Sequence, residues 1–209
     1  YANEGLIAAL NKIYDLLKVT ETNVIGYCLG GTLLASTIAL LNHSKNKIKL
    51  KNNIKTATLI ATLTNFKNVG DFALFTSESY ISYIESLMKK TGYLDKDIMF
   101  KTFNLMKAND MIWSTFVNNY LLGKDPIKLD VLTWNSDTTN MPYAMHSFLL
   151  RNMYQKNLLK VPEGISLLGV PIDLRNVKVP VFMIATEKDH IAPWSSTFEA
   201  TKLFTGPIK

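Results

Sequence analysis

The sequence contains almost no cysteine and very little arginine. Its single cysteine, Cys28, excludes an internal disulfide and is typical of a protein from a reducing compartment. Of its 23 basic residues, only Arg151 and Arg175 are arginines. The formal net charge of +6 therefore comes from lysines, which are usually solvated. No basic helix interleaved with aromatic residues is present, and we therefore expect no nucleic-acid partner.

Charged residues are absent from residues 23–42, a length close to the roughly 20 residues of a membrane span. Three glycines interrupt this stretch near its start, at Gly26, Gly30 and Gly31. We therefore expect a buried strand, a tight turn and a buried helix, and no membrane span. Residues 1–18 carry charges and no cleavage site, so no signal peptide is expected. No methionine opens the sequence, and we expect the chain to be truncated at both ends.

What is present fits a globular protein, because 47% of the residues are hydrophobic and 19% are charged. Short apolar runs at 23–27, 56–63 and 179–185 predict buried strands. The run after Cys28 has the pattern of a buried helix, so the first two strands and this helix form a βαβ unit and predict a parallel sheet.

Between the second and third strands the pattern is helical. We expect helices at 77–90, 95–107, 110–122 and 142–159, with Gly92 and Gly123 ending the first and third. A capping box of Ser196 and Glu199 predicts the start of a last helix. The organisation that follows is a sheet core at 1–63, a helical cap or lid insertion at 64–170, and the rest of the core at 171–209.

The most informative motif is the strand–turn–helix around Gly26-Tyr27-Cys28-Leu29-Gly30-Gly31. A G-x-C-x-G sequence in this position is typical of a nucleophile elbow, whose strained turn exposes the nucleophile above the sheet. The flanking glycines, Gly26 and Gly30, leave room for strand and helix to approach. The helix N-terminus favours a thiolate at Cys28, and the Leu29 amide is the expected half of an oxyanion hole. The alternative is an ordinary buried cysteine.

A candidate acid follows the third strand. Asp189 lies in the loop at its carboxyl end, where the functional groups of parallel sheets collect. Glu187 is a rival carboxylate, and a loop-capping aspartate is the alternative role. The order nucleophile, acid, histidine requires a histidine after Asp189 on a later loop. None of the three histidines, His43, His146 and His190, fits that position.

The chain resembles the poly(3-hydroxyalkanoate) synthases, particularly those that polymerise short-chain monomers. The resemblance rests on segments that follow the family's order and span nearly the whole sequence: GYCLGGTLLA, TLTNFKNVGD, NDMIWSTFVNNYLLGKDP, TWNSDTTNMPYAMHSFLLRNMYQKN and VPVFMIATEKDHIAPW. It implies an α/β-hydrolase fold with a helical cap that covers the active site and contributes to a homodimer.

The resemblance also implies a reaction. Cys28 corresponds to the nucleophile that carries the growing chain as a thioester, and Asp189 to the catalytic aspartate. The family's catalytic histidine, in a Gly-His motif, maps to no residue of this sequence. The implied substrate is an (R)-3-hydroxyacyl-CoA, with 3-hydroxybutyryl-CoA as the expected monomer, and the product is a polyester with release of CoA. No cofactor or metal is expected, and the location is the granule surface in the cytoplasm.

Two other functions stay open. A dienelactone-hydrolase-like esterase has a similar cysteine elbow, but it lacks a long helical insertion between nucleophile and acid. A catalytically incomplete fragment or scaffold of the synthase family is the alternative from a different class, because no histidine here fits the role of base.

Overall fold

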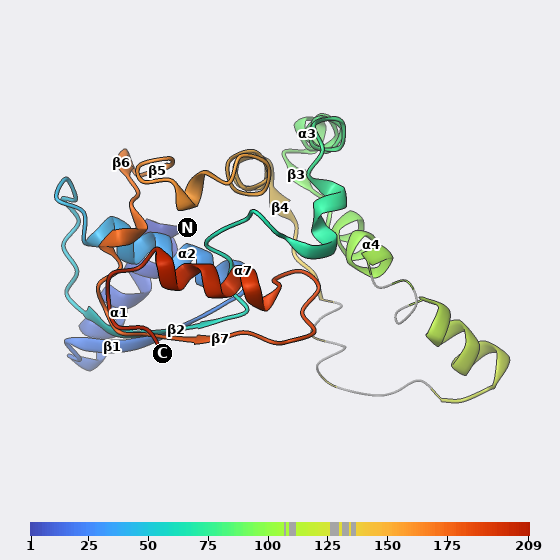
Figure 1. The fold of residues 1–209 in the computed structure, drawn as a ribbon, viewed down its shortest axis with the longest axis horizontal. Helices are drawn as coiled ribbons and strands as arrows, with labels where there is room; N and C mark the ends of the chain where they lie inside the picture. Colours follow the sequence, from blue (N-terminus) through green and yellow to red (C-terminus); the bar gives the residue numbers. More distant parts are fainter. Residues whose placement is uncertain (107, 109–111, 126–129, 131–133, 135–136) are drawn as a thin grey trace. The chain divides into compact units, whose positions relative to one another are not determined.

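The computed structural model describes residues 1–106, 108, 112–125, 130, 134 and 137–209 (Figure 1). These residues form two compact units, one of Tyr1–Ala73 with Asn152–Lys209 and one of Leu74–Arg151. The second unit is shorter at both ends than the predicted insertion at 64–170. Asn65, Phe66 and Asn157 fall within the predicted insertion but belong to the first unit. Hydrogen bonds join them there, because the Asn157 side chain accepts from the Phe66 amide and donates to the Asn65 side chain, both at 2.8 Å.

The first unit is built on a three-stranded sheet in the order β1-β2-β7. Its strands are β1 (Glu21–Tyr27), β2 (Asn53–Ile60) and β7 (Val181–Ile184), and both pairings are parallel, as the sequence predicts. The strand predicted at 56–63 lies three residues earlier. Residues 61–63 instead form the loop that leaves the carboxyl edge of the sheet.

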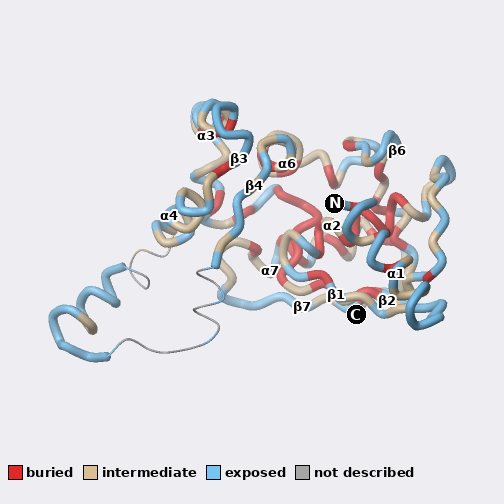
Figure 2. The backbone as a smooth tube through the Cα atoms, turned by 180° about the vertical axis from the view of Figure 1, so that it is seen from behind, coloured by how far each residue is buried: buried red, intermediate tan, exposed pale blue. Residues whose placement is uncertain are grey.

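Helices cover one face of this sheet. The charge-free stretch at 23–42 forms most of β1 and all of α2 (Leu29–Leu41), whose residues from Gly31 to Leu40 are buried apart from Leu33 (Figure 2). The other helical elements of the first unit are η1 (Ala2–Ile7), α1 (Ala8–Leu17), η6 (Leu158–Lys160), η7 (Leu174–Asn176), α7 (Trp194–Phe198) and η8 (Glu199–Lys202). A short hairpin of β5 (Ser166–Leu167) and β6 (Val170–Pro171) also belongs to it.

The opposite face of the sheet carries exposed apolar side chains. The register aligns Ile25 with Thr58 and Phe182, and it aligns Tyr27 with Ile60 and Ile184. Ile25 and Tyr27 are 72% and 63% exposed, whereas their sequence neighbour Gly26 is buried. The helices of the first unit therefore leave this face open to solvent.

The second unit is mainly helical. It contains α3 (Glu78–Thr91), α4 (Lys96–Met106), η4 (Phe116–Leu121) and α6 (Tyr143–Phe148), with a two-residue ladder between β3 (Tyr93–Leu94) and β4 (Met141–Pro142). The elements η2 (Gly70–Phe75) and η5 (Leu149–Gln155) cross the boundaries between the units. The predicted helix at 110–122 lies partly outside the described residues. Across the part of the chain that is described, no helix is long and apolar enough to cross a bilayer.

Two local features of the second unit agree with its sequence. The Ser77 side chain accepts a hydrogen bond from the Tyr80 amide at the start of α3, and Gly92 ends the helix with φ +83°. Arg151 pairs with Glu78 and Glu85, both on α3.

The expectation of a capping box at Ser196, in the first unit, is wrong, because α7 begins at Trp194 and the Ser196 hydroxyl donates to the Asn68 carbonyl at 2.7 Å.

Candidate active site

Cys28 occupies the turn between β1 and α2. Its backbone has φ +51° and ψ −122°, a combination that is strained for any residue with a side chain. The turn is held from both sides, because the Cys28 amide donates to the Ile60 carbonyl at 2.8 Å and the Cys28 carbonyl accepts from the Gly31 amide at 3.0 Å. This is the local geometry that the sequence motif predicts.

Gly26 plays the role expected of it, whereas Gly30 does not. A Cβ on Gly26 would lie 2.5 Å from the Gly31 Cα, so Gly26 allows the strand to pass the helix. A Cβ on Gly31 would lie 1.9 Å from Thr62 Oγ1, whereas one on Gly30 would meet nothing within 4 Å. The expectation that Gly30 provides the close approach is therefore wrong, because the helical turn directs position 31, not position 30, toward the loop after β2.

The pKa of the Cys28 thiol differs from the expectation that the helix N-terminus favours a thiolate. Burial raises the pKa of the Cys28 thiol, and the charge of Asp189 raises it further. A hydrogen bond from the Leu29 amide lowers this pKa, but its effect is smaller than that of burial. The expected thiolate at the helix N-terminus is therefore wrong for this chain, because desolvation of the charged form outweighs the favourable amide.

Asp189 lies in the loop that follows β7, on the same edge of the parallel sheet as Cys28. Its Oδ1 accepts hydrogen bonds from the amides of Ile191 at 2.9 Å and Ala192 at 2.8 Å. The other carboxylate oxygen, Oδ2, has no hydrogen bond to a described residue. Glu187 is exposed. Asp189 is thus the carboxylate of this loop that is fixed in position and close enough to Cys28 for their charges to interact.

The loops after β2 and β7 are joined to each other. The Asp71 amide donates to the His190 carbonyl at 2.8 Å, and Gly70 has φ +55° beside it. A Cβ on Gly70 would lie 1.9 Å from that carbonyl oxygen, so only glycine fits. This contact fixes the loop of Asp189 against the loop that follows β2.

None of the three histidines hydrogen-bonds Cys28 or Asp189 in the described structure. His43 follows α2, and its Nδ1 accepts from the Lys45 amide at 3.1 Å. His146 is buried in the second unit, its Nδ1 has no hydrogen-bond partner in the described part of the chain, and burial lowers its pKa to about 4. His190 follows Asp189 directly, and only its backbone carbonyl enters the contacts above.

Tyr154 is a residue of this region that the sequence motifs do not single out. Its ring lies 4.9 Å from the Phe66 ring and 4.6 Å from the Phe72 ring, measured between centroids. Burial raises the pKa of the Tyr154 hydroxyl, and the nearby Cys28 raises it further. The only sequence signal for this residue is its place in the segment LLRNMY, which the family resemblance includes.

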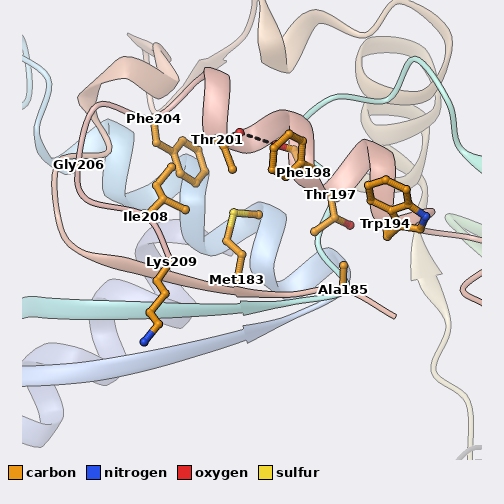
Figure 3. Close-up of a pocket in the computed structure, with 10 residues that line it drawn as sticks. All are labelled: Met183, Ala185, Trp194, Thr197, Phe198, Thr201, Phe204, Gly206, Ile208 and Lys209. Atoms are coloured by element: carbon orange, nitrogen blue, oxygen red, sulfur yellow. Dashed lines mark hydrogen bonds between the residues drawn. The ribbon is translucent and has the colours of Figure 1, made fainter. Parts of the chain in front are cut away.

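A separate cavity of about 550 Å³ lies between β7, α7 and the last residues of the chain (Figure 3). Its apolar lining includes Met183, Phe198 and Phe204, and the buried Thr197 hydroxyl beside it has no hydrogen-bond partner among the residues that the structure describes. Ile208 forms a parallel bridge to Val181 at the same place. Neither Cys28 nor Asp189 lines this cavity, so it is not the site of the candidate nucleophile. Within the described residues, no group of three or more His, Cys, Asp and Glu side chains is placed to hold a metal ion.

Comparison with known sequences gives a family and several relatives. Residues 1–206 match the family described as the alpha/beta hydrolase fold. The full chain is 44% identical to the poly(3-hydroxyalkanoate) polymerase subunit PhaC of Rhizobium etli, and 44% identical to the poly(3-hydroxyalkanoate) polymerase of Methylorubrum extorquens. It covers 32% and 33% of these proteins, so the chain spans about a third of the length of the curated relatives it matches.

Comparison with solved structures supports the fold alone. The crystal structure of the protein called non-heme bromoperoxidase BpoC, from Mycobacterium tuberculosis, matches the whole chain and 65% of its own length. The TM-score is 0.51 at 12% sequence identity. This similarity agrees with the α/β-hydrolase fold.

Proposed function

The chain belongs to the α/β-hydrolase fold family, and from this premise we propose that it is part of a poly(3-hydroxyalkanoate) synthase whose nucleophile is Cys28. One observation carries the proposal. A cysteine with a strained positive φ directly follows the first strand of a parallel sheet, in a chain whose full length is 44% identical to named polymerases. Strain at such a turn is a cost that proteins retain at functional sites.

In the first step, the Cys28 sulfur attacks the carbonyl carbon of an (R)-3-hydroxyacyl-CoA. The bond between that carbon and the CoA sulfur breaks, and CoA leaves as its thiol with the proton that Cys28 gave to a base. The Leu29 amide donates to the oxyanion of the tetrahedral intermediate. The acyl group, with 3-hydroxybutyryl as the expected monomer, is then held on Cys28 as a thioester.

In the second step, the hydroxyl of a monomer or of the growing chain attacks this thioester. An ester bond forms, the carbon–sulfur bond to Cys28 breaks, and the proton from the hydroxyl returns to the Cys28 sulfur. Each cycle therefore needs a base, because the raised pKa of Cys28 keeps its thiol protonated at neutral pH. The proposed base is the histidine of the family's Gly-His motif, with Asp189 orienting it or assisting activation of the hydroxyl.

The proposal includes partners that remain predictions. These are the CoA thioester, the growing polyester, and a second copy of the protein in a homodimer, at the surface of polymer granules in the cytoplasm. No cofactor is needed for the proposed chemistry, because the thioester substrate supplies the activated acyl group.

The test uses the full-length protein with 3-hydroxybutyryl-CoA, following CoA release and polymer in the same reaction. We expect both products, a covalent acyl group on Cys28 by mass spectrometry, and neither product with Cys28→Ala. Release of CoA with free 3-hydroxybutyrate and no polymer would favour the hydrolase alternative. No CoA release from the unsubstituted protein would favour the scaffold alternative, and an active Cys28→Ala variant would refute the role of Cys28.

A further inference from the structure

Thr32 differs from the other hydroxyl residues of α2 in where its side chain bonds. A serine or threonine inside a helix commonly donates to the carbonyl one turn earlier. Ser36 and Thr37 both do so, at 2.7 Å. The Thr32 hydroxyl instead donates to the carbonyl of Leu63, 31 positions further along the chain, at 2.7 Å. This hydrogen bond joins the first turn of α2 to the loop after β2.

The backbone of Thr32 contacts the candidate nucleophile directly. Its amide donates to the Cys28 carbonyl at 3.2 Å, one turn earlier in the chain. On the other side of the same residue, the Cys28 amide donates to the Ile60 carbonyl at 2.8 Å. Both peptide groups that flank the Cys28 side chain are therefore held by hydrogen bonds, and the Thr32 side chain connects one of them to the loop that begins after Ile60.

The turn that Thr32 holds is strained. Cys28 has φ +51° and ψ −122°, and a backbone of this kind persists only where the surrounding contacts over-determine it. Thr32 is 2% exposed and Leu63 is 5% exposed, so both partners of the hydrogen bond are buried. Without the hydroxyl, the Leu63 carbonyl would lose its hydrogen-bond partner among the described residues, and the turn would lose a contact that opposes its relaxation.

The loop after β2 is attached in turn to the strand that leads to Asp189. The Ala61 amide, at the start of this loop, donates to the Ile184 carbonyl at the end of β7, at 2.8 Å. The loop therefore lies between the two strands whose ends carry the candidate nucleophile and the candidate acid. A bond from Thr32 to this loop fixes Cys28 relative to the same frame that fixes the loop of Asp189.

We propose that Thr32 is a positioning residue for Cys28, because its hydroxyl fixes the first turn of α2 to the loop after β2 and so holds the Cys28 sulfur in the direction of attack. This inference rests on the proposed function of Cys28. Displacing a reacting group by about 1 Å costs on the order of 10²-fold in rate. Thr32 acts through the backbone of Cys28, so its effect falls on the rate of acylation and not on the binding of the thioester.

The test measures single acylation of the full-length protein by 3-hydroxybutyryl-CoA, recording the rate constant at saturation and the fraction of protein acylated at the end. Thr32→Val keeps the shape of the side chain and removes the hydroxyl. We expect the rate constant to fall on the order of 10–10²-fold, with the half-saturating concentration and the final fraction unchanged. Thr32→Ser keeps the hydroxyl and should stay near the parent rate. Loss of folded protein would instead lower the final fraction.

The matched control is Thr37→Val on the same helix. Thr37 is 0% exposed and its hydroxyl bonds within α2, so we expect its removal to leave the rate constant at the parent value. A parent rate in Thr32→Val, an equal fall in both valine variants, or a rate in Thr32→Ser as low as in Thr32→Val would overturn the inference.

A second pair of variants applies if Thr32→Val does not fold. Thr32→Ala and Thr32→Ser are both smaller than threonine, and only the serine keeps the hydroxyl, so equal rates for the two would overturn the inference. Failure of the unsubstituted protein to acylate Cys28 would instead refute the proposed function.

Discussion

Gly31 lies directly against Thr62, so that a Cβ on the glycine would stand 1.9 Å from the threonine Oγ1. Thr62 is fully buried and its hydroxyl donates to the Ile60 carbonyl, so moving its side chain away would break this hydrogen bond. The helix of the candidate nucleophile and the loop after β2 therefore approach as closely as a glycine permits. This contact sets the position of the turn that carries Cys28.

We predict that Gly31→Ala destabilises the protein by about 1–3 kcal/mol, since it forces a methyl group into a filled space. Gly30→Ala is the matched control, because its Cβ meets nothing within 4 Å. The control should leave stability unchanged or raise it by up to about 1 kcal/mol, as replacing a helical glycine with alanine does. Denaturant unfolding of both variants measures the difference, and equal stabilities would contradict the role of Gly31.

We predict that Cys28 in the 209-residue chain is alkylated slowly at neutral pH. Burial and Asp189 both favour the protonated thiol, so the thiolate fraction rises only above the ordinary thiol pKa, near 8.5. Iodoacetamide modification followed by mass spectrometry across pH 6 to 10 measures the profile. Asp189→Asn removes a negative charge and should shift the profile to lower pH. A profile with its midpoint below that of a free thiol would show that the helix N-terminus outweighs burial.

We predict that Asp189→Asn lowers turnover of the full-length protein by orders of magnitude. Misorienting the base of a nucleophile–histidine–acid site costs about 10⁴-fold. Glu187→Gln makes the same change of charge two residues earlier, on an exposed side chain, and should be mild. CoA release under saturating substrate measures both variants. A severe Glu187→Gln with a mild Asp189→Asn would assign the acid to Glu187.

We predict that the second unit loses stability as the pH falls from about 6.5 to about 4. His146 is buried and its pKa in the folded state is about 4, below the value near 6.5 of an exposed histidine. The unfolded state therefore binds the proton first, and stability present above pH 6.5 is lost on the way to pH 4. The expected loss at pH 4.5 is on the order of 2 kcal/mol.

Hydrogen exchange of the α6 segment at pH 7 and pH 4.5 measures this loss. His146→Leu removes the titrating group and should reduce the difference between the two pH values. His43→Leu, at a partly buried position in the first unit, is the control and should retain the difference. An unchanged pH dependence in His146→Leu would assign the acid sensitivity to another group.

The amino-acid sequence by itself determined the parallel sheet, the turn at Cys28 and the limits of α3. These features depend on local patterns: short apolar runs, a glycine-flanked cysteine between strand and helix, and Ser77 and Gly92 at the two ends of one helix. The positions of Cys28 and Asp189 on one edge also follow from sequence, because both residues come after strands that must run parallel.

Only the tertiary structure decided which glycine is indispensable, in which direction the pKa of Cys28 shifts, and that Tyr154 packs against Phe66 and Phe72. Gly30 and Gly31 are equivalent in sequence, but only one of them meets Thr62, a residue 31 positions further along the chain. The pKa of Cys28 depends on how much water its neighbours exclude, and desolvation there exceeds the local effect of the Leu29 amide. Tyr154 packs against Phe66 and Phe72, which precede it in the sequence by more than 80 positions. Burial and long-range packing have no local pattern in the sequence, because they arise only when distant segments fold together.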